Sequence, residues 1–185
     1  MPKRQIVVIV GLPGSGKTEV INYLIKRLGW SKIYLGEATF EEMAQRGLAI
    51  DEKNERKIRE ELRKKYGSAC YALWAIKKIK KLKVNQSVLV ESLYSWAEYL
   101  EFRKVFGGDF FVVAIYAPSR VRYARLAERK IRPLAPFEAQ SRDYCQIVNL
   151  SQAGPIAMAD YTIINEGSWR DLNKKLEVLS KILEK

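Results

Sequence analysis

The hydrophobic positions of this chain fall into short continuous runs, separated by longer stretches in which they are spaced as in a helix. The runs predict five strands, at residues 6–10, 32–35, 87–91, 110–116 and 161–164. A run that is apolar throughout, such as Ile6–Val10, is typical of a strand buried on both faces. Between the runs, spacing such as that of Val20, Leu24 and Leu28 predicts helices. This alternation predicts βα units, a largely parallel sheet and helices on both of its faces.

The longest interval between predicted strands covers residues 36–86 and has the pattern of two or three helices. A plain crossover between two strands is the alternative, but about fifty residues is long for one. Residues 129–137 contain Pro133 and Pro136, which predicts a stiff, exposed connection after a helix. We expect a single domain, residues 1–185, that contains both segments, because this length is typical of one domain.

The most specific motif lies between the first strand and the first helix. Gly11–Thr18 reads G-x-x-x-x-G-K-[ST], the phosphate-binding loop. Gly14 and Gly16 allow a tight turn that points backbone N–H groups inward, and the helix dipole adds positive potential. Lys17 is expected to reach the β- and γ-phosphates, and the Thr18 hydroxyl is the usual ligand of Mg²⁺. The nucleotide-binding residues predicted in the loop are Gly11, Gly14, Ser15, Gly16, Lys17 and Thr18.

Two carboxylates follow predicted strands, at the end of a parallel sheet where ligands bind. Glu91 ends the run 87–91, where a carboxylate can hold Mg²⁺ or its water shell, or accept a proton from a hydroxyl nucleophile. Glu37 follows the run 32–35 and has the same ligand or base interpretation. A solvated strand end is the alternative for Glu91, and a helix-start carboxylate is the alternative for Glu37.

Arginines are concentrated after the fourth predicted strand. Arg125, Arg129 and Arg132 recur at intervals of three and four, which places them on one helical face. Guanidinium groups on a lid over a γ-phosphate would neutralise charge in the transition state, and closure would exclude water. We therefore expect at least one of the three to contact phosphate. Arg142 and Asp143 have two interpretations, a packing pair or a phosphate contact.

Composition limits the chemistry. The chain has no histidine, so a general base must be a carboxylate, a lysine or a tyrosine. Cys70 and Cys145 lie in apolar helical contexts, which predicts reduced core residues and not a metal site. No signal peptide is expected before the first strand, and no apolar run reaches about 18 residues, so we expect a cytoplasmic protein.

The formal net charge of +12 indicates an anionic partner. A bound nucleotide accounts for part of this excess of positive charge. The rest has two interpretations, a solvated surface or a binding site for RNA or another polyanion. The densest cluster of basic residues, which we term the lysine cluster, has the same two interpretations. It consists of Lys77, Lys78, Lys80, Lys81 and Lys83.

Four segments together resemble an archaeal family of P-loop kinase-like proteins related to adenylate kinase and dephospho-CoA kinase. They are Gly11–Thr18, Arg122–Leu126, Arg142-Asp143 and Ala159–Ser168. The resemblance extends over nearly the whole chain and implies a three-layer αβα sandwich whose five-stranded parallel sheet has the order 2-3-1-4-5. It also implies that the nucleotide base packs near Asn165 and Gly167, that residues 129–137 form a lid, and that residues 36–86 bind the acceptor.

Two stretches depart from the pattern of that family. Gly36-Glu37 and Phe40 replace Gly-Asp followed three residues later by Arg, and Glu91–Ser95 replaces Asp-Gly-x-Arg-Ser. Two positions expected to face the phosphate of the acceptor are thus aromatic, Phe40 and Tyr94. They either stack on a ring or fill a degenerate pocket. Glu37, Phe40 and Tyr94 become the candidate acceptor-binding residues, and the acceptor is not an ordinary nucleoside monophosphate unless kinase activity is weakened.

The leading hypothesis is an ATP- and magnesium-dependent kinase that phosphorylates a small, nucleotide-like acceptor. Lys17 would hold the donor phosphates, Thr18 and Glu91 would manage Mg²⁺, and Arg129 or Arg132 would stabilise the transferring phosphoryl group. The alternative is a regulatory or RNA-associated ATPase that has no small-molecule acceptor.

Overall fold

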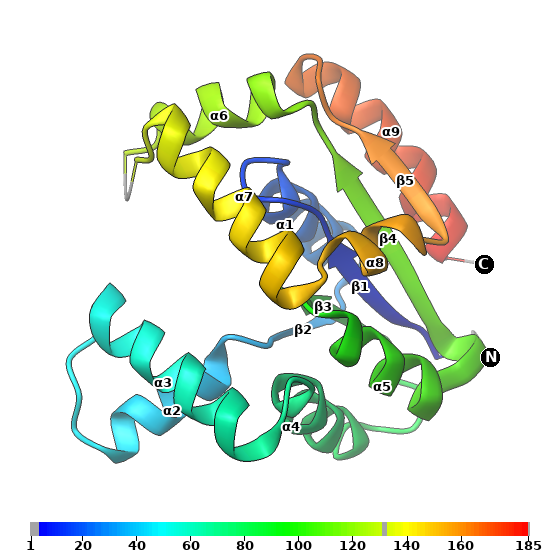
Figure 1. The fold of residues 1–185 in the computed structure, drawn as a ribbon. Helices are drawn as coiled ribbons and strands as arrows, with labels where there is room; N and C mark the ends of the chain where they lie inside the picture. Colours follow the sequence, from blue (N-terminus) through cyan, green and yellow to red (C-terminus); the bar gives the residue numbers. More distant parts are fainter. Residues whose placement is uncertain (1–3, 131–132, 185) are drawn as a thin grey trace.

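The computed structural model describes residues 4–130 and 133–184, in which parallel strands alternate with helices (Figure 1). The strands are β1 (Ile6–Val10), β2 (Ser31–Tyr34), β3 (Val88–Glu91), β4 (Phe110–Tyr116) and β5 (Tyr161–Ile164). They form a five-stranded sheet in the order β2-β3-β1-β4-β5, and every neighbouring pair is parallel. The predicted strand order is therefore confirmed.

Three strand boundaries differ by one residue from the prediction, both ends of β2 and the start of β3. β2 ends at Tyr34 because the chain turns at Gly36 into α2 (Glu37–Gln45), although Leu35 N still donates to Glu91 O (3.1 Å). β3 begins at Val88, and the preceding residue, Ser87, accepts a hydrogen bond from Gln5 N through its side chain instead (3.0 Å). Differences of this size are common where strands meet turns.

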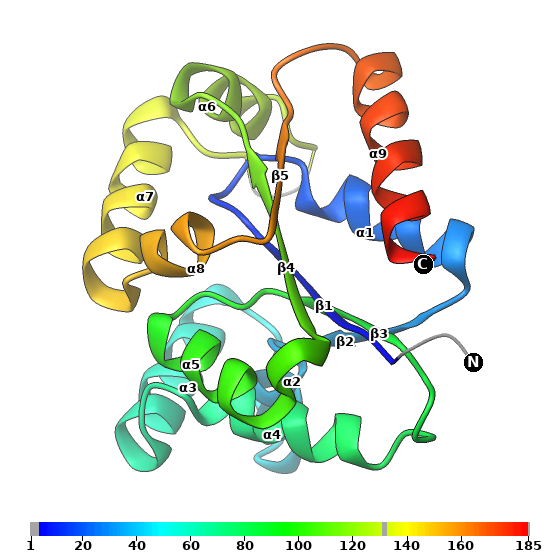
Figure 2. The same ribbon diagram turned by 90° about the vertical axis from the view of Figure 1, so that its right-hand side faces the viewer.

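Helices cover both faces of the sheet, which makes the predicted three-layer sandwich (Figure 2). One face carries α1 (Lys17–Leu28) and α9 (Trp169–Leu183). The other carries α4 (Cys70–Lys80), α5 (Trp96–Phe106) and the short α8 (Ala153–Ala157). In β1, Val8 faces the α4–α5 side, Val7 and Ile9 face the α1–α9 side, and all three are fully buried. Burial on both faces explains why the run Ile6–Val10 has no polar position.

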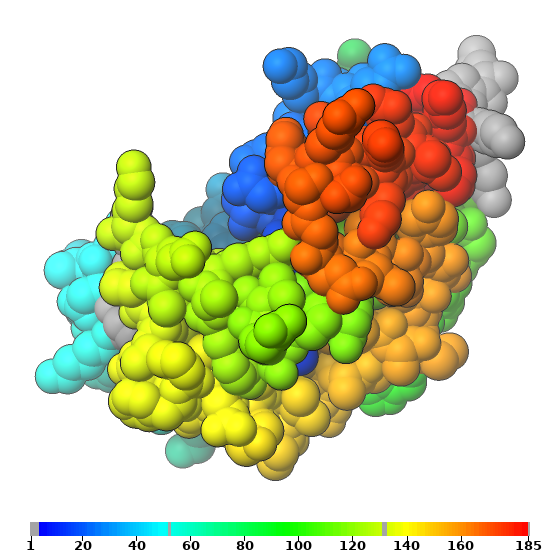
Figure 3. Space-filling view, turned by 90° about the horizontal axis from the view of Figure 1, so that it is seen from above, coloured from blue at the N-terminus to red at the C-terminus, as the bar shows by residue number. Residues whose placement is uncertain are grey.

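The interval between β2 and β3 contains three helices, α2, α3 (Glu52–Tyr66) and α4. The 3₁₀ turn Gly107–Asp109 connects α5 to β4. Two further helices, α6 (Ser119–Ala127) and α7 (Pro136–Leu150), pack together at the carboxyl end of the sheet. Figure 3, seen from above, shows them spread across this end of the molecule.

The prediction that both cysteines lie in the core is wrong for Cys145. This residue is exposed on α7, and Cys70 is only partly buried. α7 lies at the edge of the molecule, so apolar residues on its outer face, such as Phe137 and Val148, are exposed too. In the part of the chain that the structure describes, the helices are too short or too polar to span a bilayer.

Candidate nucleotide-binding site

The segment between β1 and α1 forms the glycine-rich loop that the sequence predicts. Gly14 and Gly16 have left-handed backbone conformations, with φ of 79° and 100°. A Cβ on Gly14 would lie 2.7 Å from the carbonyl oxygen of Arg122, and one on Gly16 would collide with the side-chain amide of Asn165. Glycine is thus required at both positions, by the turn itself and by the neighbours pressed against the loop.

Buried polar side chains from three distant segments hold the carbonyl groups of this loop. The bonds are Arg122 to Pro13 O (3.0 Å), Asn165 to Ser15 O (2.8 Å) and Gln152 to Gly11 O (3.1 Å). They fix the shape of the loop before any ligand binds. A preformed loop lowers the entropic cost of binding a polyphosphate.

The side chain of Lys17 is hydrogen-bonded to its own loop in this structure. Its Nζ donates to the carbonyl oxygens of Gly11 (2.7 Å) and Leu12 (3.1 Å). Burial, followed by the positive charge of Arg129, lowers the pKa of Lys17 from 10.5 to about 8, and the Glu91 carboxylate partly offsets both effects. The charged form of Lys17 is thus destabilised by its surroundings, and an anionic ligand bound beside it would stabilise that form.

We expect the affinity for ATP to fall as the pH rises above the pKa of Lys17, which is about 8. Below this pH the ammonium is already charged, whereas above it ATP binding must first take up a proton. The dissociation constant should therefore rise by up to about tenfold per pH unit. Calorimetric titrations with ATP in buffers of different ionisation enthalpy measure both the affinity and the proton uptake. A constant affinity without proton uptake up to about pH 10 would contradict the assignment of Lys17.

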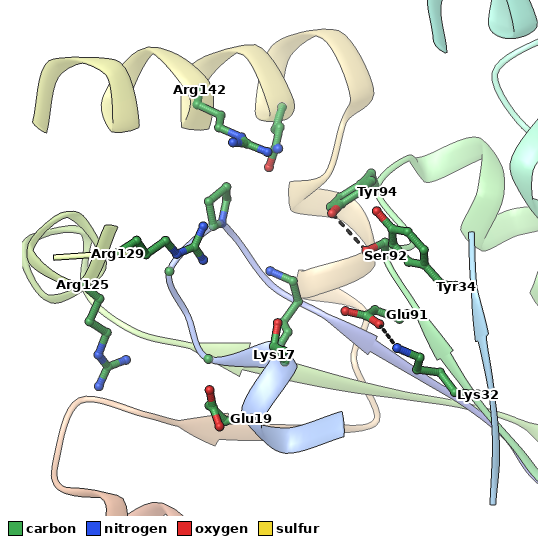
Figure 4. A pocket seen from close by; sticks show the side chains of 15 residues that line it. Lys17, Glu19, Lys32, Tyr34, Glu91, Ser92, Tyr94, Arg125, Arg129 and Arg142 are labelled. Atoms are coloured by element: carbon green, nitrogen blue, oxygen red, sulfur yellow. Dashed lines mark hydrogen bonds and ion pairs between the residues drawn. The ribbon is translucent and has the colours of Figure 1, made fainter. Parts of the chain in front are cut away.

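A cavity of about 460 Å³ opens between the loop, the ends of β2 and β3, and helices α6 and α7 (Figure 4). Several predicted donor-side residues line it: Gly14, Gly16, Lys17, Thr18, Glu91, Arg125 and Arg129. Tyr94, predicted to bind the acceptor, lines it as well. Arg142 also lines the cavity, and its contact with phosphate stays a prediction.

The remaining predicted site residues lie elsewhere. Ser15 is buried within the loop, as is Gly11. Asn165 supports the loop, and its carbonyl oxygen accepts from Arg125 (2.9 Å), so its described contacts are with protein. Gly167 is not among the residues that line the cavity. Arg132 lies outside the described residues.

Glu37 and Phe40 do not line the cavity either. Glu37 is on α2, where its carboxylate pairs with Lys78 (3.2 Å). The ring of Phe40 lies behind that of Tyr34, with 6.4 Å between the ring centroids. Their predicted contact with an acceptor therefore requires a movement of α2, and it stays a prediction.

Asp143 pairs with Arg122 and not with its neighbour Arg142. The guanidinium of Arg122 donates two hydrogen bonds to the carboxylate (3.0 and 2.6 Å), and Tyr123 Oη donates a third (3.0 Å). Both side chains of the ion pair are 5% exposed. Consecutive helical residues point about 100° apart, so Arg142 faces the cavity while Asp143 faces α6. The sequence spacing places Arg122 on the same helical face as Arg125, but its side chain is buried in this ion pair. Arg122 is thus a structural residue.

Sequence reasoning missed five residues outside the phosphate-binding loop that line the cavity: Glu19, Lys32, Tyr34, Ser92 and Gln146. Lys32 Nζ forms an ion pair with Glu91 Oε2 (3.0 Å), and Tyr34 is the register partner of Glu91. The strand order was the signal that could have found both, because it places the end of β2 beside the end of β3. Ser92 has φ of 72°, a conformation rare for residues other than glycine, and no sequence pattern indicates it.

Comparison with known proteins places the chain in a family. The model of an AAA domain matches residues 7–148. A UPF0200 protein of Thermococcus kodakarensis is 33% identical over 186 residues, which cover 96% of this chain and all of that relative. This chain belongs to the UPF0200 family. A UPF0200 protein of Pyrococcus abyssi is likewise 33% identical, over 94% of each chain. The predicted resemblance to an archaeal P-loop family is confirmed.

Solved structures show that the UPF0200 chain has a P-loop kinase-like fold. TT1252 from Thermus thermophilus superposes with a TM-score of 0.65 at 18% identity, over 98% of both chains. A shikimate kinase from Bacteroides thetaiotaomicron gives 0.63 at 14% identity, over 98% of this chain and 99% of the other. A gluconokinase from Sinorhizobium meliloti gives 0.61 at 12% identity, over 100% and 95%. At such identities the likeness concerns the fold alone.

The lysine cluster of this UPF0200 protein is partly neutralised within the molecule. Lys78 Nζ pairs with Glu41 (2.7 Å) and Glu37 (3.2 Å) and lies 4.1 Å from the centre of the Trp74 ring. The other members are exposed: Lys77, Lys80, Lys81 and Lys83. Lys78 thus stabilises the packing of α2 against α4, and RNA binding by the rest stays a prediction.

Proposed function

We propose that this protein binds ATP with Mg²⁺ and transfers the γ-phosphoryl group to a small acceptor. One observation carries the proposal: Lys17, Arg129 and Glu91, from three distant parts of the chain, line a single cavity. Two cations suit a phosphoryl group, and a carboxylate suits the hydroxyl that attacks it. The P-loop kinase-like fold supports this interpretation.

On the donor side, the triphosphate would lie in the concave loop. Lys17 would exchange the carbonyl oxygens of its own loop for the β- and γ-phosphates. Arg129 and Arg142 would stabilise the charge that spreads over the transferring group.

The residues at the mouth of the loop fit Mg²⁺. Thr18 lies exposed in the first turn of α1, Glu91 ends β3, and both line the cavity. Hydroxyl and carboxylate oxygens are ligands that Mg²⁺ accepts alongside phosphate oxygens and water. Bound Mg²⁺ would neutralise phosphate charge, and Thr18 with Glu91 would hold it.

Replacing Glu91 tests the acid–base part of the proposal. We expect Glu91→Gln to lower kcat by about 10²- to 10⁴-fold, because the amide cannot accept the proton of the acceptor hydroxyl. Steady-state kinetics measure kcat, and titration with Mg²⁺ and ATP measures binding. Unchanged binding with a reduced kcat indicates a base, whereas weaker Mg²⁺ binding indicates a metal ligand. Glu177→Gln, an exposed position on α9, is the control, and a Glu91→Gln enzyme with the turnover of the control would contradict both roles.

The direct test of the function is transfer of label from γ-labelled ATP. Incubation with a panel of small metabolites should give a labelled product under the proposal. The alternative, a regulatory or RNA-associated ATPase, gives labelled inorganic phosphate at most. Slow hydrolysis alone across the panel would overturn the kinase proposal and favour the alternative. The cytoplasmic location and the acceptor role of residues 36–86 stay predictions.

A further inference from the structure

Most cations of the cavity lie on one side of it. They are Lys17 of the loop, Arg125 of α6, Arg129 in the segment after α6 and Arg142 of α7 (Figure 4). None of them forms an ion pair with another described residue, and the exposed Glu19 of α1 also lines this side. All four cations surround the position expected for the donor phosphates. The triphosphate therefore has its positive partners on one side of the cavity only.

The opposite side, which we term the β2–β3 wall, consists of Lys32, Tyr34, Glu91, Ser92 and Tyr94 (Figure 4). Lys32 is the one cation of this wall among the described residues, and its ammonium lies 3.0 Å from the Glu91 carboxylate. The wall thus has no net charge. Glu55 and Arg59 of α3, which act electrostatically on Tyr34, form another ion pair (3.1 Å).

Hydroxyl groups dominate the rest of the β2–β3 wall. Tyr94 Oη donates to Ser92 Oγ (3.1 Å), which orients both groups at the end of β3. Burial, followed by Tyr94 and the negative charge of Glu91, raises the pKa of Tyr34 to about 12. Tyr34 therefore stays neutral at physiological pH and keeps a proton to donate. Two tyrosine rings with hydroxyl tips suit a ligand that has apolar faces and polar edges.

We propose that the acceptor is an uncharged, hydroxyl-bearing molecule of the nucleoside class and that the β2–β3 wall selects it over its phosphorylated counterpart. This inference rests on the proposed function. A phosphomonoester bound here would face the negative charge of the Glu91 carboxylate. Lys32 could pair with the phosphate group only by breaking its ion pair with Glu91. With Glu91 acting as the base and not as a ligand of Mg²⁺, either arrangement leaves a partly buried charge without a partner, which is costly. A neutral hydroxyl group instead donates to Glu91 while Lys32 stays in place.

The transfer step then needs no further charged group from the acceptor. The acceptor hydroxyl oxygen forms a bond to the γ-phosphorus, and its proton passes to the Glu91 carboxylate. The bond between the γ-phosphorus and the β,γ-bridging oxygen breaks, and ADP leaves with the electron pair. Lys17 and Arg129 stabilise the charge on the moving group.

The test compares matched acceptors with the wild-type protein. Nucleosides are paired with their 5′-monophosphates, and product formation from ATP is followed by mass spectrometry and initial rates. We expect at least one nucleoside to be phosphorylated with a kcat/KM at least about tenfold above that of its monophosphate. Preference for a monophosphate would overturn the inference, and so would the absence of any phosphorylated nucleoside. In both cases measured ATP binding would leave the donor side of the proposed function standing, whereas failure to bind ATP would overturn both proposals.

A charge variant examines the wall itself. Tyr94→Arg adds an unpaired cation, so the preference for the neutral acceptor should shrink by at least about tenfold. Tyr94→Phe is matched in ring size without added charge and should keep that preference. Thermal melting verifies that both variants fold. If Tyr94→Arg does not fold, the comparison of nucleosides with monophosphates on the wild-type protein tests the inference by itself. Equal discrimination by the two folded variants would overturn the role of the wall.

Discussion

Lys17→Ala is expected to lower the affinity for ATP by at least about a hundredfold and to abolish phosphoryl transfer. Charge-assisted hydrogen bonds to phosphate contribute about 1.5–3 kcal/mol each, and Lys17 is placed to make them with two phosphates. About 2.7 kcal/mol corresponds to a hundredfold in the dissociation constant. Isothermal titration calorimetry measures the affinity, and transfer of labelled phosphate measures the activity.

Lys26→Ala provides the matched control. Lys26 is exposed in the last turn of α1, so the substitution removes the same charge from the same helix away from the cavity. Thermal melting must accompany both variants, since Lys17 also bonds the carbonyl groups of Gly11 and Leu12. A folded Lys17→Ala protein that binds ATP as tightly as Lys26→Ala would refute the site.

Asp143→Ala is expected to lower the free energy of unfolding by about 3–5 kcal/mol. The substitution leaves the Arg122 guanidinium charged at 5% exposure without its carboxylate partner. It also releases the group that holds Pro13 O, so the glycine-rich loop should lose order together with stability. Urea denaturation followed by circular dichroism measures the free energy.

Two further variants separate this pair from general effects on α7. Ser141→Ala changes an exposed residue of the same helix and should stay within about 0.5 kcal/mol of the wild type. The double variant Arg122→Met with Asp143→Leu removes both charges and should lose less stability than the two single changes summed. A loss below about 1 kcal/mol in Asp143→Ala would show that the buried pair contributes little.

The elements that could be predicted depend on residues close together in the sequence. The strand β1 follows from the unbroken run Ile6–Val10, and the loop follows from Gly11–Thr18. The cap of α9 is local too, because the Ser168 side chain accepts a hydrogen bond from Asp171 N three residues later. Each of these signals lies within one strand or one helical turn. The strand order, in contrast, came from the resemblance and not from periodicity.

The parts that could not be predicted join distant residues. Lys32 and Glu91 are 59 positions apart, and Asn165 meets Ser15 across 150 positions. The sequence pattern around a charged residue near a strand end does not show whether its side chain contacts solvent, a phosphate group or an oppositely charged side chain. Phe40 shows the consequence: its ring packs 6.4 Å from that of Tyr34 and does not line the cavity, a position that its sequence context does not indicate. Its contact with an acceptor stays a prediction.

By itself the sequence determined the alternation of strands and helices and the phosphate-binding loop, since backbone periodicity and a local turn are encoded by adjacent residues. Only the tertiary structure decided that Arg122 is buried with Asp143 while Arg142 reaches the cavity. It also decided that the charge of Glu91 is balanced by Lys32. These outcomes depend on which strands and helices become neighbours, and that arrangement sets the burial and the charge of the site.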